Sequence, residues 1–379
     1  MSVKYDLPPS ALNARSRWVL WRNRILGSAR FQHWAARNIL TRGVARRRAA
    51  AQFDLVAGFV YSQILAAFVE AGLLEFLDGV LRSDAAVAAH ARLPPDATDR
   101  LLRAAAALGL AESPQPGLWT LGSAGAELKP NRGGQAMIAH HQLLYADLAA
   151  PLDLLRAGRS APTALSRFWT YVARQPEDAA QEVAPYSALM AATQPMVVAE
   201  IMGRFDFGAS RRMLDIGGGS GSFARTVAAA VPGIDIGIFD LPEVVALAEQ
   251  RFAADPPVRP IALIGGSFKS DPLPVGHDLM TLVRILHDHD DTVAESLLRS
   301  IFAALPGNGR LLIVEPLADE SVAPRMGDAY FGLYLWAMGS GRPRSFGSLQ
   351  AMLHAAGFRR VRRIATAQPI ITSALVATK

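Results

Sequence analysis

The residues best suited to chemistry lie in the second half of the chain, in a glycine-rich loop that follows an apolar run. The loop contains Gly217, Gly219 and Gly221, and Asp215 stands just before it. A strand that turns sharply into a helix needs glycines where its backbone takes unusual dihedral angles or approaches a ligand. A second acid, Asp240, follows the next apolar run, where a carboxylate can accept hydrogen bonds from both ribose hydroxyls of an adenosine. The pattern predicts a site for an adenosine-containing ligand.

The glycine pattern alone also occurs in nicotinamide-dependent enzymes and, in a poorer form, in structural turns. Asp215 narrows the choice, because a buried acid at a strand end is costly unless it serves a cationic group or backbone amides. S-adenosylmethionine carries a positive ammonium and a positive sulfonium and has no phosphate. The two acids therefore favour S-adenosylmethionine as the cofactor.

A third feature is the run His287-Asp288-His289-Asp290-Asp291, which follows a later apolar stretch. Imidazole and carboxylate both ligate metals, but two histidines two residues apart on a turn rarely converge without a distant third ligand. We therefore expect no metal site. Asp290 or Asp291 more simply caps the helix expected from Thr292, and a purely structural His287 stays open as an alternative.

Together with Leu311-Leu312-Ile313-Val314-Glu315-Pro316, these motifs resemble the large O-methyltransferase family that includes plant phenol methyltransferases, acetylserotonin methyltransferase and many bacterial natural-product enzymes. The resemblance covers nearly the whole chain from about Phe53, and it rests on four motifs in order rather than on any one of them. It implies that His287 is the general base that deprotonates the acceptor hydroxyl and that Glu315 orients its imidazole. It also implies a set of cofactor-binding residues: Asp215, Gly217, Gly219, Asp240, Leu241, Ser267, Phe268 and Arg284.

The chain departs from the family pattern at three places. His289 stands where most members have tryptophan, and Ser267 stands where they have an adenine-binding acid. In Gly341-Arg342-Pro343-Arg344-Ser345 a proline replaces a second glutamate that flanks the catalytic histidine in many members. The last departure puts a two-carboxylate clamp on His287 in doubt.

Short apolar runs that alternate with amphipathic helices after Arg212 predict an α/β fold with a Rossmann-like, mostly parallel, seven-stranded sheet. A mostly helical, winged-helix-like dimerisation domain is expected before it, which gives three parts: residues 1–50, 51–205 and 206–379. The apolar residues Phe53, Val56, Val60, Ile64 and Phe68 recur every three or four positions, which predicts that an amphipathic helix starts near Phe53. The expected strands are Met213–Ile216, Ile236–Phe239, Ile261–Ile264, Leu279–Leu286 and Leu311–Glu315, with one or two more in Ala365–Thr378.

The winged-helix outline invites a DNA-binding interpretation, which the sequence disfavours. The would-be recognition helix, from Ala97 to Leu108, is mostly alanine and leucine and offers only Arg100 and Arg103 to reach bases. We therefore expect no nucleic-acid partner. Asp96 is a plausible N-cap of this helix.

The charge is unevenly distributed along the chain. The net charge is +6, but residues 1–50 hold eleven Lys or Arg and one acid and thus carry +10, which leaves −4 for the other 329 residues. Trp18, Trp21 and Trp34 lie among these arginines. Residues 15–48 could lie on an anionic membrane or pack on a partner subunit, and both interpretations stay open.

The chain contains no cysteine, which excludes disulfides and thiolate chemistry and fits a reducing compartment. The arginines interrupt every apolar run of a secretory signal, and no segment reaches the length of a membrane span. We expect a cytoplasmic homodimer, and contact with the inner membrane is one of the two open interpretations of residues 15–48.

The acceptor is expected to be apolar, because the candidate pocket residues are aromatic or flexible and offer few polar partners, although each could equally be core. These residues are Phe168, Trp169, Tyr171, Tyr186, Met190, Phe331, Tyr334, Trp336 and Met338. The basic residues 1–50 and the Gly341-Arg342-Pro343-Arg344 variant are similar to the corresponding segments of bacterial carotenoid O-methyltransferases. That similarity implies methylation of the tertiary hydroxyl of a hydroxyneurosporene- or demethylspheroidene-type carotenoid. A phenolic polyketide or indole alcohol is the alternative acceptor, and a non-catalytic winged-helix regulator is an alternative of another class.

Overall fold

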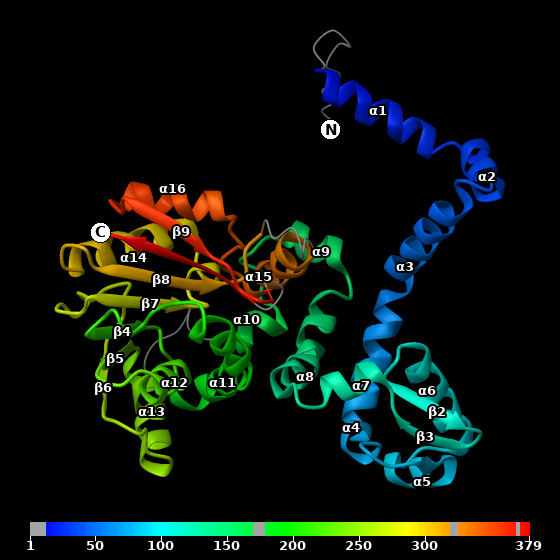
Figure 1. Cartoon of the computed structure of the whole chain (residues 1–379), viewed down its shortest axis with the longest axis horizontal. Helices are drawn as coiled ribbons and strands as arrows, with labels where there is room; N and C mark the ends of the chain where they lie inside the picture. The colour runs from blue at the N-terminus through cyan, green and yellow to red at the C-terminus, as the bar shows by residue number, and fades with distance from the viewer. Residues whose placement is uncertain (1–12, 170–178, 319–324, 369–371) are drawn as a thin grey trace. The chain divides into compact units, whose positions relative to one another are not determined.

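The computed structural model describes residues 13–169, 179–318, 325–368 and 372–379, and the side chains of residues 179–187 lie outside this description. The chain forms two compact units, residues 1–124 and 125–379, which are described separately (Figure 1). The pocket residue Tyr171 and the side chain of Tyr186 fall outside the described parts.

The second unit is built on a seven-stranded sheet with the strand order β6-β5-β4-β7-β8-β10-β9. The first five strands in this order run parallel, and β10 is antiparallel to both of its neighbours. The chain goes outward from β4 in one direction and then starts again at β7, so the order reverses between these two central strands. Ligands of open α/β sheets bind outside the carboxyl ends of the strands at such a reversal. The bounds are β4 Arg212–Ile216, β5 Asp235–Asp240, β6 Ile261–Gly265, β7 Leu279–Val283, β8 Arg310–Glu315, β9 Arg360–Ile364 and β10 Ser373–Thr378.

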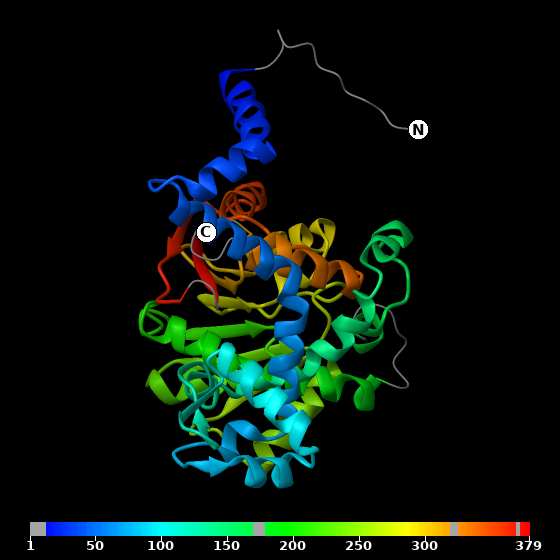
Figure 2. The same cartoon turned by 90° about the vertical axis from the view of Figure 1, so that its right-hand side faces the viewer.

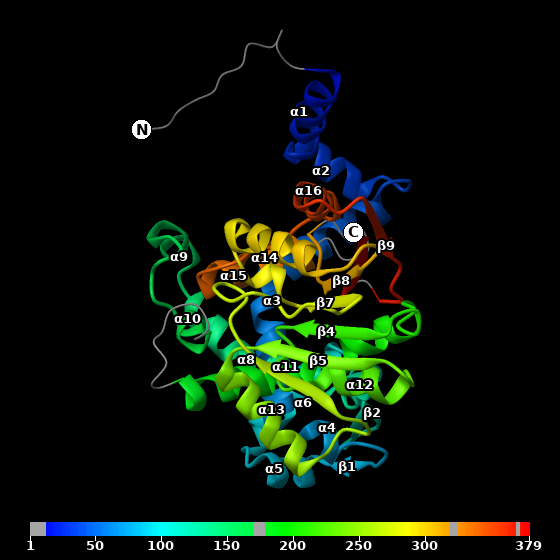
Figure 3. The ribbon, with the colours of Figure 1, turned by 90° about the vertical axis from the view of Figure 1, so that its left-hand side faces the viewer.

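Helices cover both faces of this sheet, which is why its central strands β7 and β8 are buried almost throughout and mostly apolar (Figure 3). One core layer packs α11 and α12 on the sheet, with Phe252 of α13 at its edge. The other packs α14 and α16, whose apolar residues alternate at helical spacing. The bounds are α11 Ala179–Met202, α12 Ser222–Ala230, α13 Pro242–Ala254, α14 Asp291–Ala304 and α16 Phe346–Ala356. The predicted fold class is confirmed.

Some helices of the second unit come before the first strand of the sheet in the sequence, and others follow β8. Together they form a layer that contains an aromatic cluster. Its core contains Leu165, Trp169 and Tyr334, with Tyr330, Phe331 and Trp336 packed against it. The elements are α8 Arg132–Asp147, α9 Pro151–Ala157, α10 Ala164–Phe168, the π-helix η5 Met326–Phe331 and α15 Gly332–Met338. Helix α7, Ser123–Leu128, spans the chain boundary between the two units.

The first unit has a long helix, α3, with a small helical and stranded body at its carboxyl end (Figure 2). Two helices, α5 and α6, are followed by a hairpin in a three-stranded sheet of order β1-β3-β2, which is the expected winged-helix outline. The bounds are α1 Ala14–Leu26, α2 Ala29–Arg37, α3 Arg42–Glu70, α4 Leu73–Phe76, β1 Arg82–Ser83, α5 Asp84–Ala91, α6 Pro95–Ala107, β2 Ala111–Gln115 and β3 Leu118–Leu121.

Five local expectations were wrong. Helix α3 starts at Arg42 rather than near Phe53. No segment was expected to reach the length of a membrane span, but α3, alone among the described helices, is long and apolar enough to cross a membrane, with 17% of its most apolar stretch buried. Pro94 rather than Asp96 occupies the N-cap of α6, because Pro95 fits the first helical turn. Strand β7 ends at Val283 instead of Leu286, and β9 begins at Arg360, before Ala365.

Candidate active site

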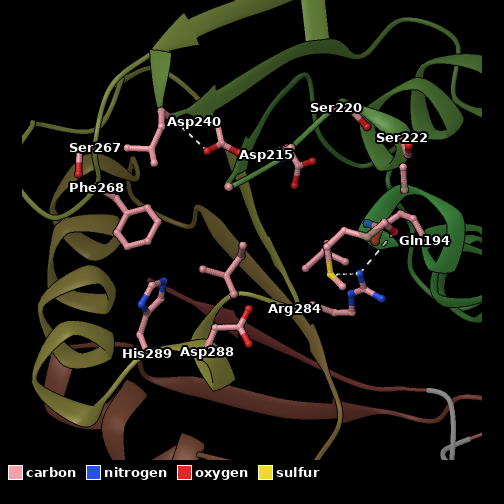
Figure 4. Close-up of a pocket in the computed structure, with 18 of the residues that line it drawn as sticks. Gln194, Asp215, Ser220, Ser222, Asp240, Ser267, Phe268, Arg284, Asp288 and His289 are labelled. Carbon is pink, nitrogen blue, oxygen red and sulfur yellow. Dashed lines mark hydrogen bonds between the residues drawn. The ribbon is translucent and has the colours of Figure 1, made fainter. Parts of the chain in front are cut away.

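A cavity of about 1020 Å³, counted with its open mouth, lies at the carboxyl ends of the central parallel strands (Figure 4). All eight predicted cofactor-binding residues line it: Asp215, Gly217, Gly219, Asp240, Leu241, Ser267, Phe268 and Arg284. They come from the ends of four strands, so the sheet brings together residues that are up to about 70 positions apart in the sequence. Their roles remain predictions.

Two glycines of the loop differ in their surroundings: Gly217 is closely packed, whereas Gly219 borders open space. A Cβ atom on Gly217 would come within 2.4 Å of the Ile285 side chain, whereas one on Gly219 would meet nothing within 4 Å and would project into open space. Both residues have positive φ angles, 69° and 58°, which a side chain would strain. The loop therefore exposes bare backbone to the cavity, as close approach of a ligand requires.

Asp240 closes the loop from the neighbouring strand. Its Oδ2 accepts a hydrogen bond from the backbone N–H of Gly219 at 2.8 Å, and its Oδ1 accepts one from Leu241 N–H at 2.8 Å. Burial raises the pKa of Asp240 to about 6, although both backbone hydrogen bonds act in the opposite direction. The carboxylate keeps further lone pairs for a diol that enters the cavity.

Asp215 is the more deeply buried acid, with 1% of its surface exposed. Its Oδ1 accepts a hydrogen bond from Thr281 Oγ1 at 2.6 Å, while its Oδ2 has no hydrogen-bond partner among the described residues. Burial raises the pKa of Asp215 to about 7, against the Thr281 hydrogen bond and with help from the charge of Asp240. An unsatisfied buried carboxylate oxygen beside a cavity suits a cationic ligand group.

Aromatic rings line another part of the cavity. Phe268 meets His289 edge to face, with ring centroids 5.3 Å apart (Figure 4). Burial and the charge of Lys269 lower the pKa of His289 to about 3, so this ring is a neutral imidazole at cellular pH. The Ser267 hydroxyl accepts from the backbone N–H of Lys269 at 3.3 Å. A flat heterocycle could stack here without meeting a charged histidine.

Arg284 marks the abrupt end of β7. It has a positive φ of 59°, unusual for a residue with a side chain, and its N–H donates to Val314 O at 2.7 Å. Its guanidinium donates to Thr193 Oγ1 at 2.6 Å and contacts the Met190 sulfur at 2.6 Å. Arg284 therefore links the turn after β7 to α11, and these contacts hold its strained backbone conformation in place.

His287 lies in a single 3₁₀ turn, η4 Leu286–Asp288, one residue away from the cavity lining. Its Nδ1 is 3.4 Å from Glu315 Oε2, and its Nε2 is 3.2 Å from Asp288 Oδ1. The same Glu315 oxygen accepts the backbone N–H of His287 at 3.1 Å. Burial lowers the pKa of His287, but the charges of Asp288 and Glu315 outweigh it and raise the pKa above the ordinary value.

The second carboxylate beside His287 therefore comes from the next residue, not from the segment where family members carry glutamate. Asp288 also lines the cavity, whereas neither His287 nor Glu315 does. The imidazole faces the aromatic cluster instead, with the Phe331 ring centroid 6.0 Å away. His287 thus lies between the cofactor cavity and the aromatic cluster.

The proline-containing segment holds this turn in place. Arg344 is fully buried and donates to the carbonyls of Leu286 at 2.6 Å and His289 at 2.7 Å, and it pairs with Asp291 at 2.8 Å. Ser340 Oγ donates to Asp288 O at 2.6 Å. Asp290 occupies the N-cap of α14, but its carboxylate accepts from Gly341 N–H rather than from the helix.

The predicted acceptor residues lie in two places. Met190 lines the cavity, and Phe331, Tyr334 and Trp336 belong to the aromatic cluster, while Trp169 belongs to both. Phe168 contacts the His140 ring at a centroid distance of 4.8 Å. Met338 is buried in the core of the cluster.

Several site residues escaped the sequence analysis. Two adjacent histidines of α8 hydrogen-bond two tyrosines, His140 to Tyr334 at 2.9 Å and His141 to Tyr330 at 2.7 Å, because the fold brings segments about 190 residues apart together. Gln194 lines the cavity one helical turn after Met190, a spacing that could have indicated it. Among the described residues, no group of three or more His, Asp or Glu side chains converges as metal ligands would.

Two families of known protein domains match most of the chain. Residues 146–359 match the O-methyltransferase domain family, and residues 53–128 match the O-methyltransferase dimerisation domain. The chain is 39% identical to demethylspheroidene O-methyltransferase of Rhodobacter capsulatus, over 98% of this chain and 92% of that protein. The chain belongs to the O-methyltransferase family.

Two further relatives agree with this assignment. Demethylspheroidene O-methyltransferase of Cereibacter sphaeroides is 37% identical over 94% of each chain. The crystal structure of human N-acetylserotonin methyltransferase in complex with S-adenosylmethionine superposes with a TM-score of 0.70, at 26% identity, over 88% of this chain and 97% of that one. The protein is an S-adenosylmethionine-dependent O-methyltransferase.

The residues of the cavity fit this cofactor. The unsatisfied oxygen of Asp215 suits its ammonium, the carboxylate of Asp240 suits its ribose hydroxyls, and the open space at Gly219 admits it against the backbone. The rings of Phe268 and the neutral His289 would suit a flat, uncharged group such as the adenine.

Asp215 gives a prediction for cofactor binding. Its carboxyl has a pKa of about 7 in the free protein and must be ionised to bind an ammonium, so affinity should fall as the pH drops below about 7, and binding should release protons. Asp215→Asn should weaken binding at least about tenfold at pH 8 and remove this pH dependence. Titration calorimetry in buffers of different ionisation enthalpy measures both effects.

Glu249→Gln, which removes an exposed carboxylate from α13, is the control and should leave binding unchanged. An Asp215→Asn protein with normal affinity and an unaltered pH profile would show that this acid does not hold the cofactor.

Proposed function

We propose that this O-methyltransferase methylates a hydroxyl of an apolar acceptor and that His287 is its general base. The observation that carries the proposal is the position of the imidazole, between two carboxylates and between the cofactor cavity and the aromatic cluster. S-adenosylmethionine, when bound, supplies a methyl group on a positively charged sulfur.

Each residue then has a defined task. Asp215, Asp240 and the glycine loop would hold and orient the donor against the acceptor hydroxyl, and this positioning would supply most of the acceleration. His287 Nε2 would take the proton of the acceptor hydroxyl, which requires Asp288 to give up its contact with this nitrogen. Glu315 keeps Nδ1 protonated and stabilises the imidazolium that forms.

The flanking carboxylates also bear on the kind of hydroxyl. Because they raise the pKa of His287, they make its neutral form a stronger base than an isolated imidazole. An aliphatic alcohol is a much weaker acid than a phenol and benefits more from such a base. This supports an aliphatic acceptor over the phenolic or indole-type alternative.

We propose the tertiary 1-hydroxyl of an acyclic carotenoid, of the demethylspheroidene or hydroxyneurosporene type, as the acceptor. Two relatives that carry the name demethylspheroidene O-methyltransferase align with this chain over almost its full length. The aromatic cluster beside His287 is apolar enough to suit a polyene. Trp169 and Met190 would contact the acceptor near the cofactor, and Phe331 near the base. Phe168, Tyr186, Tyr334 and Trp336 are proposed to complete the acceptor pocket.

The acceptor can be identified with labelled cofactor. The enzyme is incubated with S-[methyl-³H]adenosylmethionine and a lipid extract from a carotenoid-producing bacterium, and the products are separated by chromatography. Label should enter a carotenoid fraction, and an extract from a strain without hydroxylated carotenoids serves as the control. Label found only in water-soluble phenols would refute the carotenoid assignment and favour the alternative.

We further propose that the enzyme is a homodimer whose functional parts are residues 1–50, 51–205 and 206–379. In the dimerisation domain, α3 exposes large apolar side chains, including Phe53 at 63%, Val56 at 73% and Phe59 at 72%. A twin subunit would bury them, which also explains an apolar helix of this length without a bilayer span. A carotenoid dissolves in bilayers, so we propose a cytoplasmic enzyme that works at the inner membrane.

The dimer gives a direct prediction. Val56→Asp with Phe59→Glu should convert the dimer to a monomer in sedimentation velocity, because the interface would bury two uncompensated charges. Leu152→Asp, at a 61% exposed position on α9, is the matched control and should stay dimeric. A native chain that sediments as a monomer would contradict the proposal.

A further inference from the structure

Helices α1 and α2 form an arm that has almost no core of its own. No side chain of α1 is buried, and Ala35 is the one buried residue of α2. Helices of 13 and 9 residues are marginal in water without tertiary packing, so a surface outside the arm must stabilise them. We refer to these two helices together with the start of α3, residues 13–48, as the arm.

The arm displays large apolar side chains to solvent. Trp18 is 54% exposed, Trp21 60% and Trp34 53%, and the turn between α2 and α3 exposes Ile39 at 74% and Leu40 at 86%. Tryptophan is the residue that prefers the boundary between headgroups and acyl chains, because one end of its ring system is apolar and the other can donate a hydrogen bond.

The same arm carries only positive charge. It contains ten arginines and no Asp or Glu, and among the described residues none of these arginines forms an ion pair. Arg22 lies over the Trp18 ring at 5.0 Å, so cationic and aromatic groups share one surface. Such mixing suits the headgroup region of an anionic bilayer, where guanidinium groups reach phosphates while the rings enter the boundary.

We infer that the arm docks on the surface of an anionic lipid bilayer and holds the enzyme where its acceptor dissolves. A second copy of the chain fits less well, because a two-fold contact between arms would set arginines against arginines. The inference rests on the proposed function only for its purpose, the capture of an apolar acceptor.

The range of the sequence matches supports the same assignment. The dimerisation-domain match starts at residue 53 and so leaves the arm outside the family's domains. The match to the R. capsulatus enzyme spans 98% of 379 residues, which leaves about eight unmatched and therefore takes in the arm. The arm thus accompanies the catalytic fold in a relative named for a carotenoid substrate.

The test is co-sedimentation of the full-length protein with vesicles of phosphatidylcholine alone or with about one third phosphatidylglycerol. Binding should need the anionic lipid and weaken in high salt. Arg15→Gln/Arg17→Gln/Arg24→Gln should lower vesicle affinity at least about tenfold, and Trp18→Ala/Trp21→Ala should lower it by a similar factor. All five residues are at solvent-exposed positions and outside the catalytic cavity.

The matched control is Arg359→Gln/Arg360→Gln/Arg362→Gln, which removes the same charge from exposed positions around β9. It should bind vesicles like the native chain. An equal loss in this control would show that general charge, not the arm, causes binding. Arm variants that keep vesicle binding but change the sedimentation coefficient would assign the arm to a subunit contact and overturn the inference, as would preference for duplex DNA over anionic vesicles.

Activity separates this inference from the proposed function. Arm variants should methylate a detergent-dispersed acceptor at the native rate and lose at least about tenfold in rate when the acceptor is in anionic vesicles. Loss in both assays would point to misfolding, which circular dichroism would reveal. Native vesicle binding by a chain that methylates no carotenoid would leave the arm assignment standing and defeat the acceptor assignment.

Discussion

The buried imidazole of His287, between the carboxylates of Asp288 and Glu315, is the interaction on which the active site depends. Two acids within 3.4 Å of one buried ring are stable only while that ring can carry a positive charge between them. The two carboxylates are therefore already in place, before the reaction, to stabilise the positive charge that His287 acquires when it takes the acceptor proton. The rest of the second unit keeps this ring at that place.

The sheet and the segment after the π-helix share that task. The reversal of strand order between β4 and β7 brings the glycine loop and the catalytic turn to one edge. Arg344 then fixes the carbonyls on both sides of His287, and any side chain on Gly341 would collide with the His287 carbonyl. The proline that replaces the family's glutamate therefore removes one carboxylate from the site without loosening the turn. Asp288 supplies the second charge instead.

The sequence predicted the sheet and the cofactor cavity well because both depend on local patterns. Apolar runs, glycines and acids at strand ends determine where Asp215, Asp240 and Phe268 lie, and all of them line the cavity. Glu315 was predicted beside His287 through the family resemblance, and it lies there. The contact of Asp288 with His287 was missed because it depends on the backbone of a single turn, and the His140–Tyr334 pair was missed because it joins segments far apart in the chain. Helix α3 was predicted too short because its first two turns, which contain Arg42 and Arg46–Arg48, do not resemble the start of an apolar helix, although arginine favours helix formation.

The central claim is tested most directly by the pH dependence of single-turnover methyl transfer in the native enzyme and in His287→Ala, with cofactor affinity measured in parallel. The base works in its neutral form, so the native rate should rise with pH. The midpoint of this rising limb of the pH profile should lie above the ordinary pKa of imidazole. His287→Ala should lose about 10²–10⁴-fold in rate and lose the limb, with cofactor affinity unchanged. A variant that keeps the native rate and the native limb would show that the proton goes elsewhere.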